Sequence, residues 1–437
     1  MLDSRPTPAT DLLIRGAHVL DPRAGIDGPL DVLVRDGEIA ELGTDIEAPD
    51  IEVIDGEGRH LFPGFVDPHV HLRTPGQEHK ETLESGTRAA AAGGYVAVAA
   101  MPNTDPTVDS ASVLIALREQ ARRDARVPVG FLAAVTRGLG GEALTEMAEL
   151  RDAGALGFTD DGKPVHRAGI LRKALHYQRL AGGVLCLHEE DPTLSGRGVM
   201  HEGAVSARLG LAGIPSVSES TLIARDAALA GYEDGRIHIQ HLSARESVEA
   251  VAAAKARGVR ITAEASPHHL TLTDQALLDE LDTRLKMNPP LRAEEDRQAL
   301  IAGLRDGTID CIATDHAPHA REEKEVPFEE APMGTTGLET AFAALFTELV
   351  LPGVLPLGLV VDKLSSGAAL LDLPLPAIER GRPANLCLVD LDAEWVVGEH
   401  GYESKAENCC FDGRTLRGRV VATIAAGAVA HWERVLA

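Results

Sequence analysis

The sequence has 437 residues, a formal net charge of −25 at pH 7 and 44% apolar residues. That length exceeds one small domain and suits a barrel of ~250 residues or more with an accessory module. The acidic balance argues against nucleic acid or an anionic membrane surface as the main partner. Five cysteines without zinc-finger spacing and a polar first segment predict a cytoplasmic protein with no signal peptide.

The two ends of the chain share one pattern. Residues 11–60 contain short apolar runs broken by Gly16, Gly28 and Gly37, which is typical of a small antiparallel sheet. The same pattern of short apolar runs occurs again only in residues 385–390 and 418–424. We therefore predict that residues 1–60 and 377–437 together form one β-sandwich, interrupted by a central domain of residues 61–376.

The central part alternates apolar strand-like runs with helical runs, and this alternation indicates βα units. Helical spacing is clear in residues 82–92 and 247–257. Another apolar run, 342–361, is interrupted by charge and proline, so it predicts a core helix and a turn rather than a membrane span. Eight strands are expected, and eight such units close into a (β/α)8 barrel. They lie near residues 62–70, 95–101, 127–134, 156–159, 184–187, 237–240, 260–265 and 309–314.

The first of these strands carries a His-x-His pair. Residues two apart in an extended segment point to the same side, so His69 and His71 aim both imidazoles at one point, as a metal ion requires. Two ordinary, partly buried histidines would give the same pattern. Asp67 is near enough to orient one imidazole.

Further ligand types occur where later strands end. Asp161, His188, His241 and Asp315 follow the fourth, fifth, sixth and eighth strands. All strand C-termini of such a barrel gather on one rim, where active sites lie. The set suffices for two divalent ions about 3.5–4 Å apart, which can share a water and lower its pKa to supply hydroxide. Such a site hydrolyses amides, esters or phosphate esters, and Asp315 is placed to move the proton.

The combination of motifs resembles the dihydroorotases of the larger bacterial kind, within the amidohydrolase superfamily. The resemblance covers almost the whole chain. Its segments are PGFVDPHVHLRTPG (63–76), MPNT (101–104), TDDG (159–162), HE (188–189), HLS (241–243), SPHHL (266–270), KMNPPLR (286–292), TDHAPH (314–319), GLE (337–339) and residues 408–427.

This resemblance implies reversible hydrolysis of the dihydroorotate ring to N-carbamoyl-aspartate, a step of pyrimidine synthesis. It implies two Zn²⁺ ions per subunit, bridged by Asp161 and a hydroxide. One zinc would be held by His69, His71 and Asp315, and the other by His188 and His241. The implied substrate contacts are His71, Arg73, Asn103, Asn288, His319, Met333 and Gly334.

Several alternatives stay open. Relatives such as hydantoinases and allantoinases bridge their metals with a carbamylated lysine, and Lys163 is two residues from Asp161. A cyclic amidase of that kind, or a non-catalytic partner of aspartate transcarbamoylase, is the rival function. Resemblance also suggests a homodimer and a possible association with that transferase.

Other rim residues have a structural interpretation. His268 and His269 are expected to hold the rim together, His316 to support its neighbour Asp315, and Asp160 to point away from Asp161. The charged segment 321–332 is a candidate lid. Cys409 and Cys410, which replace the family's usual Thr-Pro, are expected to be small buried residues.

Overall fold

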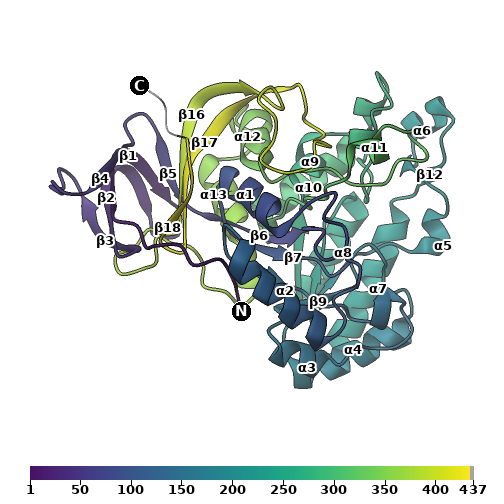
Figure 1. The fold of residues 1–437 in the computed structure, drawn as a ribbon. Helices are drawn as coiled ribbons and strands as arrows, with labels where there is room; N and C mark the ends of the chain where they lie inside the picture. Colours follow the sequence, from purple (N-terminus) through teal and green to yellow (C-terminus); the bar gives the residue numbers. More distant parts are fainter. Residues whose placement is uncertain (434–437) are drawn as a thin grey trace.

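The computed structural model describes residues 1–433. Strands from both ends of the chain form one sheet, as expected (Figure 1). It is hydrogen-bonded as a continuous eight-stranded sheet in the order β18-β17-β16-β5-β1-β2-β3, with β4 paired to β1. The strands are β1 (Leu12–Asp21), β2 (Ile26–Arg35), β3 (Glu38–Gly43), β4 (Glu52–Asp55), β5 (His60–Pro63), β16 (Leu386–Val396), β17 (Thr415–Ala425) and β18 (Ala428–Trp432).

The sheet is closed over its own apolar core. Leu12 and Ile14 of β1 pack with Val32 of β2 and with Leu386 and Leu388 of β16. Residues of the two chain ends thus share one core, which each end alone is too short to build.

The middle of the chain forms the expected parallel barrel. Its strands are β6 (Phe65–Val70), β7 (Tyr95–Ala100), β8 (Val129–Phe131), β9 (Gly157–Thr159), β10 (Val184–Leu187), β13 (Arg236–Ile239), β14 (Arg260–Ala265) and β15 (Cys311–Ile312). Parallel bridges from Ala133 to Phe158 and from Val70 to His316 join the two parts of this sheet. The eight strands therefore close into a ring.

Helices follow the barrel strands and cover the outside. The longer ones are α1 (Leu83–Ala92), α2 (Ala111–Asp124), α4 (Ala168–Ala181), α7 (Val217–Glu233), α8 (Arg245–Ala256), α10 (Glu294–Asp306) and α13 (Leu357–Ser365). Shorter pieces are α3 (Met147–Asp152), α5 (Pro192–Ser195), α6 (Ala204–Leu209), α9 (Pro267–Thr271), α11 (Arg321–Lys324), α12 (Ala341–Leu345) and α14 (Gly367–Leu370), with a small ladder of β11 (Met200–His201) and β12 (Gly213–Ile214). None of the helices among the described residues is long and apolar enough to cross a bilayer.

The first barrel strand begins later than expected. The predicted run 62–70 divides at Gly64: the residues before it pair with β16 in the terminal sheet, and β6 begins at Phe65. A Cβ at Gly64 would lie 2.2 Å from a methyl carbon of Val96, so glycine is the residue that fits at this position. The strand expected at 309–314 is likewise short, with a ladder over Cys311–Ile312 only.

Aromatic rings join the terminal sheet to the barrel. Phe342 packs against Phe62 of β5 and against Phe65 of β6, each with ring centroids 5.7 Å apart. The Thr423 hydroxyl of β17 donates to the Ala91 carbonyl of α1 at 2.7 Å. These contacts hold β6, and hence the His-x-His pair, against a rigid support.

Candidate metal centre

Six histidines and aspartates from five strand ends lie together at the barrel rim. His69 belongs to β6, and the others follow the ends of β6, β9, β10, β13 and β15; they are His71, Asp161, His188, His241 and Asp315. All six are buried. His241 and Asp315 also take positive φ angles of 33° and 49°, which are uncommon for residues other than glycine and gather at functional sites.

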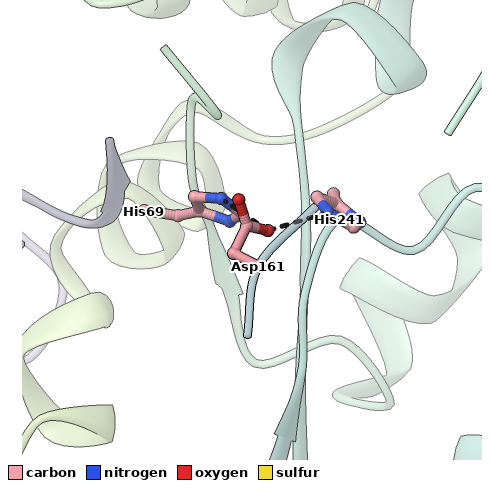
Figure 2. A group of neighbouring side chains, drawn as sticks. All are labelled: His69, Asp161 and His241. Carbon is pink, nitrogen blue, oxygen red and sulfur yellow. Dashed lines mark ion pairs between the residues drawn. The ribbon is translucent and has the colours of Figure 1, made fainter. Parts of the chain in front are cut away.

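Asp161 lies at the middle of this cluster. Figure 2 shows its carboxylate between the imidazoles of His69 and His241. Its Oδ1 lies 3.5 Å from His69 Nε2 and 3.7 Å from both His241 Nε2 and His188 Nδ1. Its Oδ2 lies 3.4 Å from His71 Nε2. Asp161 therefore faces all four imidazoles.

Asp315 closes the other side of the cluster. Its Oδ1 lies 3.1 Å from His71 Nε2 and 3.4 Å from His69 Nε2. Two groups of donors result: His69, His71 and Asp315 form one, and His69, Asp161 and His241 form the other, each with donor atoms within 4.8 Å of one another.

The geometry fits bound cations. Donors about 2.0–2.2 Å from a tetrahedral ion lie about 3.4 Å from one another. The separations above fall near that value. Among the described residues, His69 Nε2 and Asp161 Oδ1 are buried without any hydrogen-bond partner, a costly situation that a metal ion relieves.

Electrostatics favour the charged carboxylates. Burial raises the pKa of Asp161, but the imidazoles of His69, His241 and His71 outweigh burial and hold that pKa well below its usual value. Burial also raises the pKa of Asp315, but the imidazoles of His69 and His71 outweigh burial and lower that pKa below its usual value. Both side chains are thus ready as anionic ligands.

The imidazoles are oriented by partners outside the cluster. Nδ1 of His69 lies 2.7 Å from Glu264 Oε1, and Nδ1 of His71 lies 3.0 Å from Asn103 Oδ1. Glu190 Oε2 lies 3.4 Å from His188 Nε2. Sequence reasoning missed Glu264 and Glu190. The spacing Glu190 to His188 was visible in the sequence, whereas nothing local linked Glu264 to His69, 195 positions away.

The expectation that Asp67 orients an imidazole is wrong. Its carboxylate accepts from the backbone N–H of His69 at 3.0 Å and from the backbone N–H and hydroxyl of Thr314 at 3.1 and 2.5 Å. Burial raises the pKa of Asp67 to about 7, with the Thr314 hydrogen bond opposing it. Asp67 therefore ties the first barrel strand to the eighth.

The predicted substrate residues surround the same rim. Arg73 is buried at φ 56°, and its Nε donates to the Pro318 carbonyl at 2.9 Å. Asn103 Nδ2 lies 3.3 Å from Asp161 Oδ2. Asn288 Nδ2 donates to Glu190 Oε2 at 2.6 Å.

His319 and the segment after the candidate lid also come together. His319 Nε2 lies 3.0 Å from the Met333 carbonyl oxygen. A Cβ at Gly334, which has φ 140°, would lie 2.9 Å from Ala317 Cβ and 3.0 Å from His319 Nε2. Burial and the positive charge of Arg73 lower the pKa of His319 to about 3, so this ring is neutral.

His268 and His269, which were expected to have structural roles, hydrogen-bond to neighbouring groups outside the cluster. The Ser266 hydroxyl lies 3.0 Å from His268 Nε2 and 2.6 Å from His269 Nδ1, and His269 Nε2 donates to the Pro289 carbonyl at 2.9 Å. The expectation that His316 supports Asp315 is wrong, because its imidazole Nε2 lies 3.4 Å from Glu81 Oε2 and its Nδ1 accepts from the backbone N–H of Gly337 at 3.2 Å.

The neighbours of Asp161 face elsewhere. Asp160 accepts from the backbone N–H groups of Val135 and Thr136 at 2.8 and 3.0 Å, so it points away from the cluster as expected. Lys163 is exposed. Cys409 and Cys410 are buried free thiols, as predicted.

The chain is similar to known proteins in both sequence and fold. Residues 58–247 match the family model described as "Dihydro-orotase-like". The chain is 47% identical to a dihydroorotase of Pelotomaculum thermopropionicum, covering 97% of this chain and 99% of the relative, and 46% identical to one of Anaeromyxobacter dehalogenans, covering 97% and 98%.

Solved structures of related cyclic amidases share the fold. The L-hydantoinase (dihydropyrimidinase) of Arthrobacter aurescens superposes with a TM-score of 0.85 at 26% identity, covering 98% of both chains. The dihydropyrimidinase of Brevibacillus agri has a TM-score of 0.83 at 24% identity, covering 97% of this chain and 95% of that one. Near-full-length identity close to one half, together with the donor cluster at the rim, places the chain in the dihydroorotase family of the amidohydrolase superfamily.

Proposed function

We propose that the chain reversibly hydrolyses the cyclic amide of (S)-dihydroorotate to N-carbamoyl-L-aspartate, a step of de novo pyrimidine synthesis. The observation that carries this proposal is the buried cluster of six donors beside the buried Arg73. Metal ions bound by such a cluster would activate water for amide hydrolysis, and a buried guanidinium selects a substrate that bears a carboxylate. The dihydroorotase relatives support dihydroorotate as the ring that is hydrolysed.

We assign two Zn²⁺ ions to the cluster. His69, His71 and Asp315 would hold one, His188 and His241 the other, and Asp161 would bridge them. Ions bound there would polarise the amide carbonyl and lower the pKa of a shared water. An aspartate that faces four imidazoles supports the bridging role, and the exposed position of Lys163 argues against a carbamate there.

The protein's own groups would bind the ring and move the proton. Asp315 Oδ1 would take the proton from the attacking water and give it to the leaving nitrogen, and do the reverse in ring closure. Arg73, Asn103 and His319 would bind the substrate carboxylate, with Arg73 presenting a planar fork of donors. Asn288 and the backbone of Met333 and Gly334 would contact the rest of the ring.

We propose four further properties of the chain. We divide the chain into a terminal sheet domain, residues 1–60 and 377–437, and a barrel domain, residues 61–376. From the resemblance we also propose a homodimer and a possible association with aspartate transcarbamoylase, and from the scattered cysteines a cytoplasmic location.

Metal content measured alongside a dihydroorotate hydrolysis assay tests the proposal. We expect roughly two zinc equivalents per chain and loss of activity with a chelator. His188→Ala should lose mainly one equivalent, whereas His268→Gln, which changes another buried rim histidine, should keep both. Full activity in metal-free protein would overturn the proposal.

A further inference from the structure

A chain of buried hydrogen bonds runs through the barrel interior beneath the donor cluster. His238 Nδ1 lies 2.9 Å from the Thr262 hydroxyl, and His238 Nε2 lies 3.0 Å from Glu264 Oε2. Glu264 Oε1 lies 2.7 Å from His69 Nδ1 and accepts from the backbone N–H of His241 at 3.2 Å. Glu264 is 1% exposed, so its carboxylate sits wholly inside the protein and touches two of the proposed metal ligands.

This second group of ligand types is saturated with hydrogen bonds. His238, Glu264 and Cys311 have donor atoms within 4.8 Å of one another, a spacing that also suits a metal. Each Glu264 oxygen and each His238 nitrogen, however, already has a polar partner. Burial also raises the pKa of the Cys311 thiol well above its usual value, which keeps it neutral and a poor ligand. The group therefore acts on its neighbours rather than as a separate metal site.

The proton on His69 can be placed from its contacts. Besides Glu264, the Gln240 amide nitrogen lies 3.2 Å from His69 Nδ1. An amide nitrogen cannot accept a hydrogen bond, whereas an ionised carboxylate accepts hydrogen bonds and cannot donate one. Glu264 Oε1 also accepts from the backbone N–H of His241, and it lies closer to His69 Nδ1 than the Gln240 amide does, at 2.7 Å against 3.2 Å. Nδ1–H of His69 therefore donates to Glu264, and Nε2 keeps its lone pair for the cluster.

We propose that Glu264 is a positioning residue that fixes the tautomer and ring direction of His69 and thereby sets the zinc affinity of the cluster, with His238 holding the far oxygen of Glu264 in place. This inference rests on the proposed metal-dependent function. A carboxylate that accepts from a ligating imidazole orients the ring and makes its other nitrogen a stronger donor. Loss of such a partner typically costs about 10–100-fold in metal affinity.

The test compares zinc affinity, measured by competition with a chromophoric chelator, in wild type, Glu264→Gln and Glu339→Gln. Gln keeps the length of Glu264 and an acceptor for His69 but removes the charge. We expect the weaker of the two zinc sites to lose about tenfold or more in affinity. Glu339 is a half-buried carboxylate, which accepts from the backbone N–H groups of Glu403 and Ser404 and has no contact with the cluster, so Glu339→Gln should keep wild-type affinity.

Cobalt(II) loading and thermal unfolding of the apo-protein separate positioning from general stability. Glu264→Gln should alter the visible cobalt spectrum, and Glu339→Gln should not, even where both lower the unfolding temperature. Should Glu264→Gln fail to fold, Glu264→Asp keeps the charge but withdraws it from His69 by one methylene, and the same loss of affinity is expected. Wild-type zinc affinity in a folded Gln or Asp variant would overturn the inference. Failure of wild type to bind zinc would instead overturn the proposed function.

Discussion

Oδ1 of Asp315 lies 3.1 Å from Nε2 of His71, although 244 positions separate the two residues in the chain. Their contact joins the end of the eighth barrel strand to the end of the first. The backbone repeats this closure, because the N–H of His71 donates to the carbonyl of His316 at 2.8 Å. The closing seam of the barrel is therefore also where the proposed proton carrier meets a proposed metal ligand.

Asp315→Asn tests the proton-transfer role. The amide cannot take up the proton, so we expect turnover in both directions to fall by about 10²–10⁴-fold. In wild type, hydrolysis should rise with pH because the attacking water must lose a proton, and ring closure should fall. Rates measured from pH 5.5 to 9 in both directions check this. Asp310→Asn is the control: it changes a carboxylate that pairs with Lys255, before β15 rather than at the rim. Wild-type rates in Asp315→Asn would exclude the role.

Arg73→Met tests substrate selection. A ring without the carboxylate leaves buried donors unpaired, so wild type should prefer dihydroorotate over dihydrouracil by a factor on the order of 10⁴. The variant should lose about a hundredfold or more in kcat/KM for dihydroorotate and much of that preference. Arg260→Met removes an arginine whose side chain is 56% exposed at the start of β14, opposite the rim, and should change neither value. Equal turnover of both rings by wild type would favour the hydantoinase alternative.

Asp161 and Lys163 can be distinguished by how the metal centre assembles. A carbamate needs dissolved carbon dioxide, whereas an aspartate with a lowered pKa is already ionised. We therefore expect apo-protein to regain full activity with zinc in bicarbonate-free buffer. Lys163→Ala should keep both metals, and Asp161→Ala should lose them or lose activity. A mass spectrum that shows carbamylated Lys163 in the active enzyme would contradict the assignment.

Buried neutral histidines should make the fold less stable in acid. Burial lowers the pKa of His268 to about 4, against an unfolded value near 6.5. Below pH 6.5 the unfolded chain therefore binds more protons than the folded one, and the free energy of unfolding falls as the pH falls.

The expected loss from His268 between pH 7 and pH 5 is about 1–2 kcal/mol. Urea unfolding of chelator-treated protein at the two pH values measures it. His268→Gln should reduce the difference between them by that amount, with His79→Gln, at an exposed position, as the control. An unchanged difference in His268→Gln would show that His268 is already charged in the folded protein.

Much of the site was predictable because its signals are local. His69 and His71 share a side because side chains alternate along a strand, and that rule holds whatever the rest of the chain does. Asp161, His188, His241 and Asp315 each lie within three residues of the end of an apolar strand, and parallel strands of a barrel end on the same rim. The residue types, their positions and the barrel thus follow from pattern alone. The division of the first strand at Gly64 did not, since the residues before it pair with β16 and those after it with β7, and neither partner strand is evident from this segment alone.

The partners of these residues were decided by the tertiary structure. Asp67 lies two residues from His69 yet contacts only its backbone N–H and Thr314, and the imidazole of His69 hydrogen-bonds to Glu264 instead. Contacts across the barrel interior depend on which strands are neighbours and on how their registers are offset, and the sequence of one strand carries neither quantity. Alternation along β6 determined that His69 and His71 share a side, whereas only the closed barrel, in which β15 alone separates β14 from β6, determined which carboxylate holds His69.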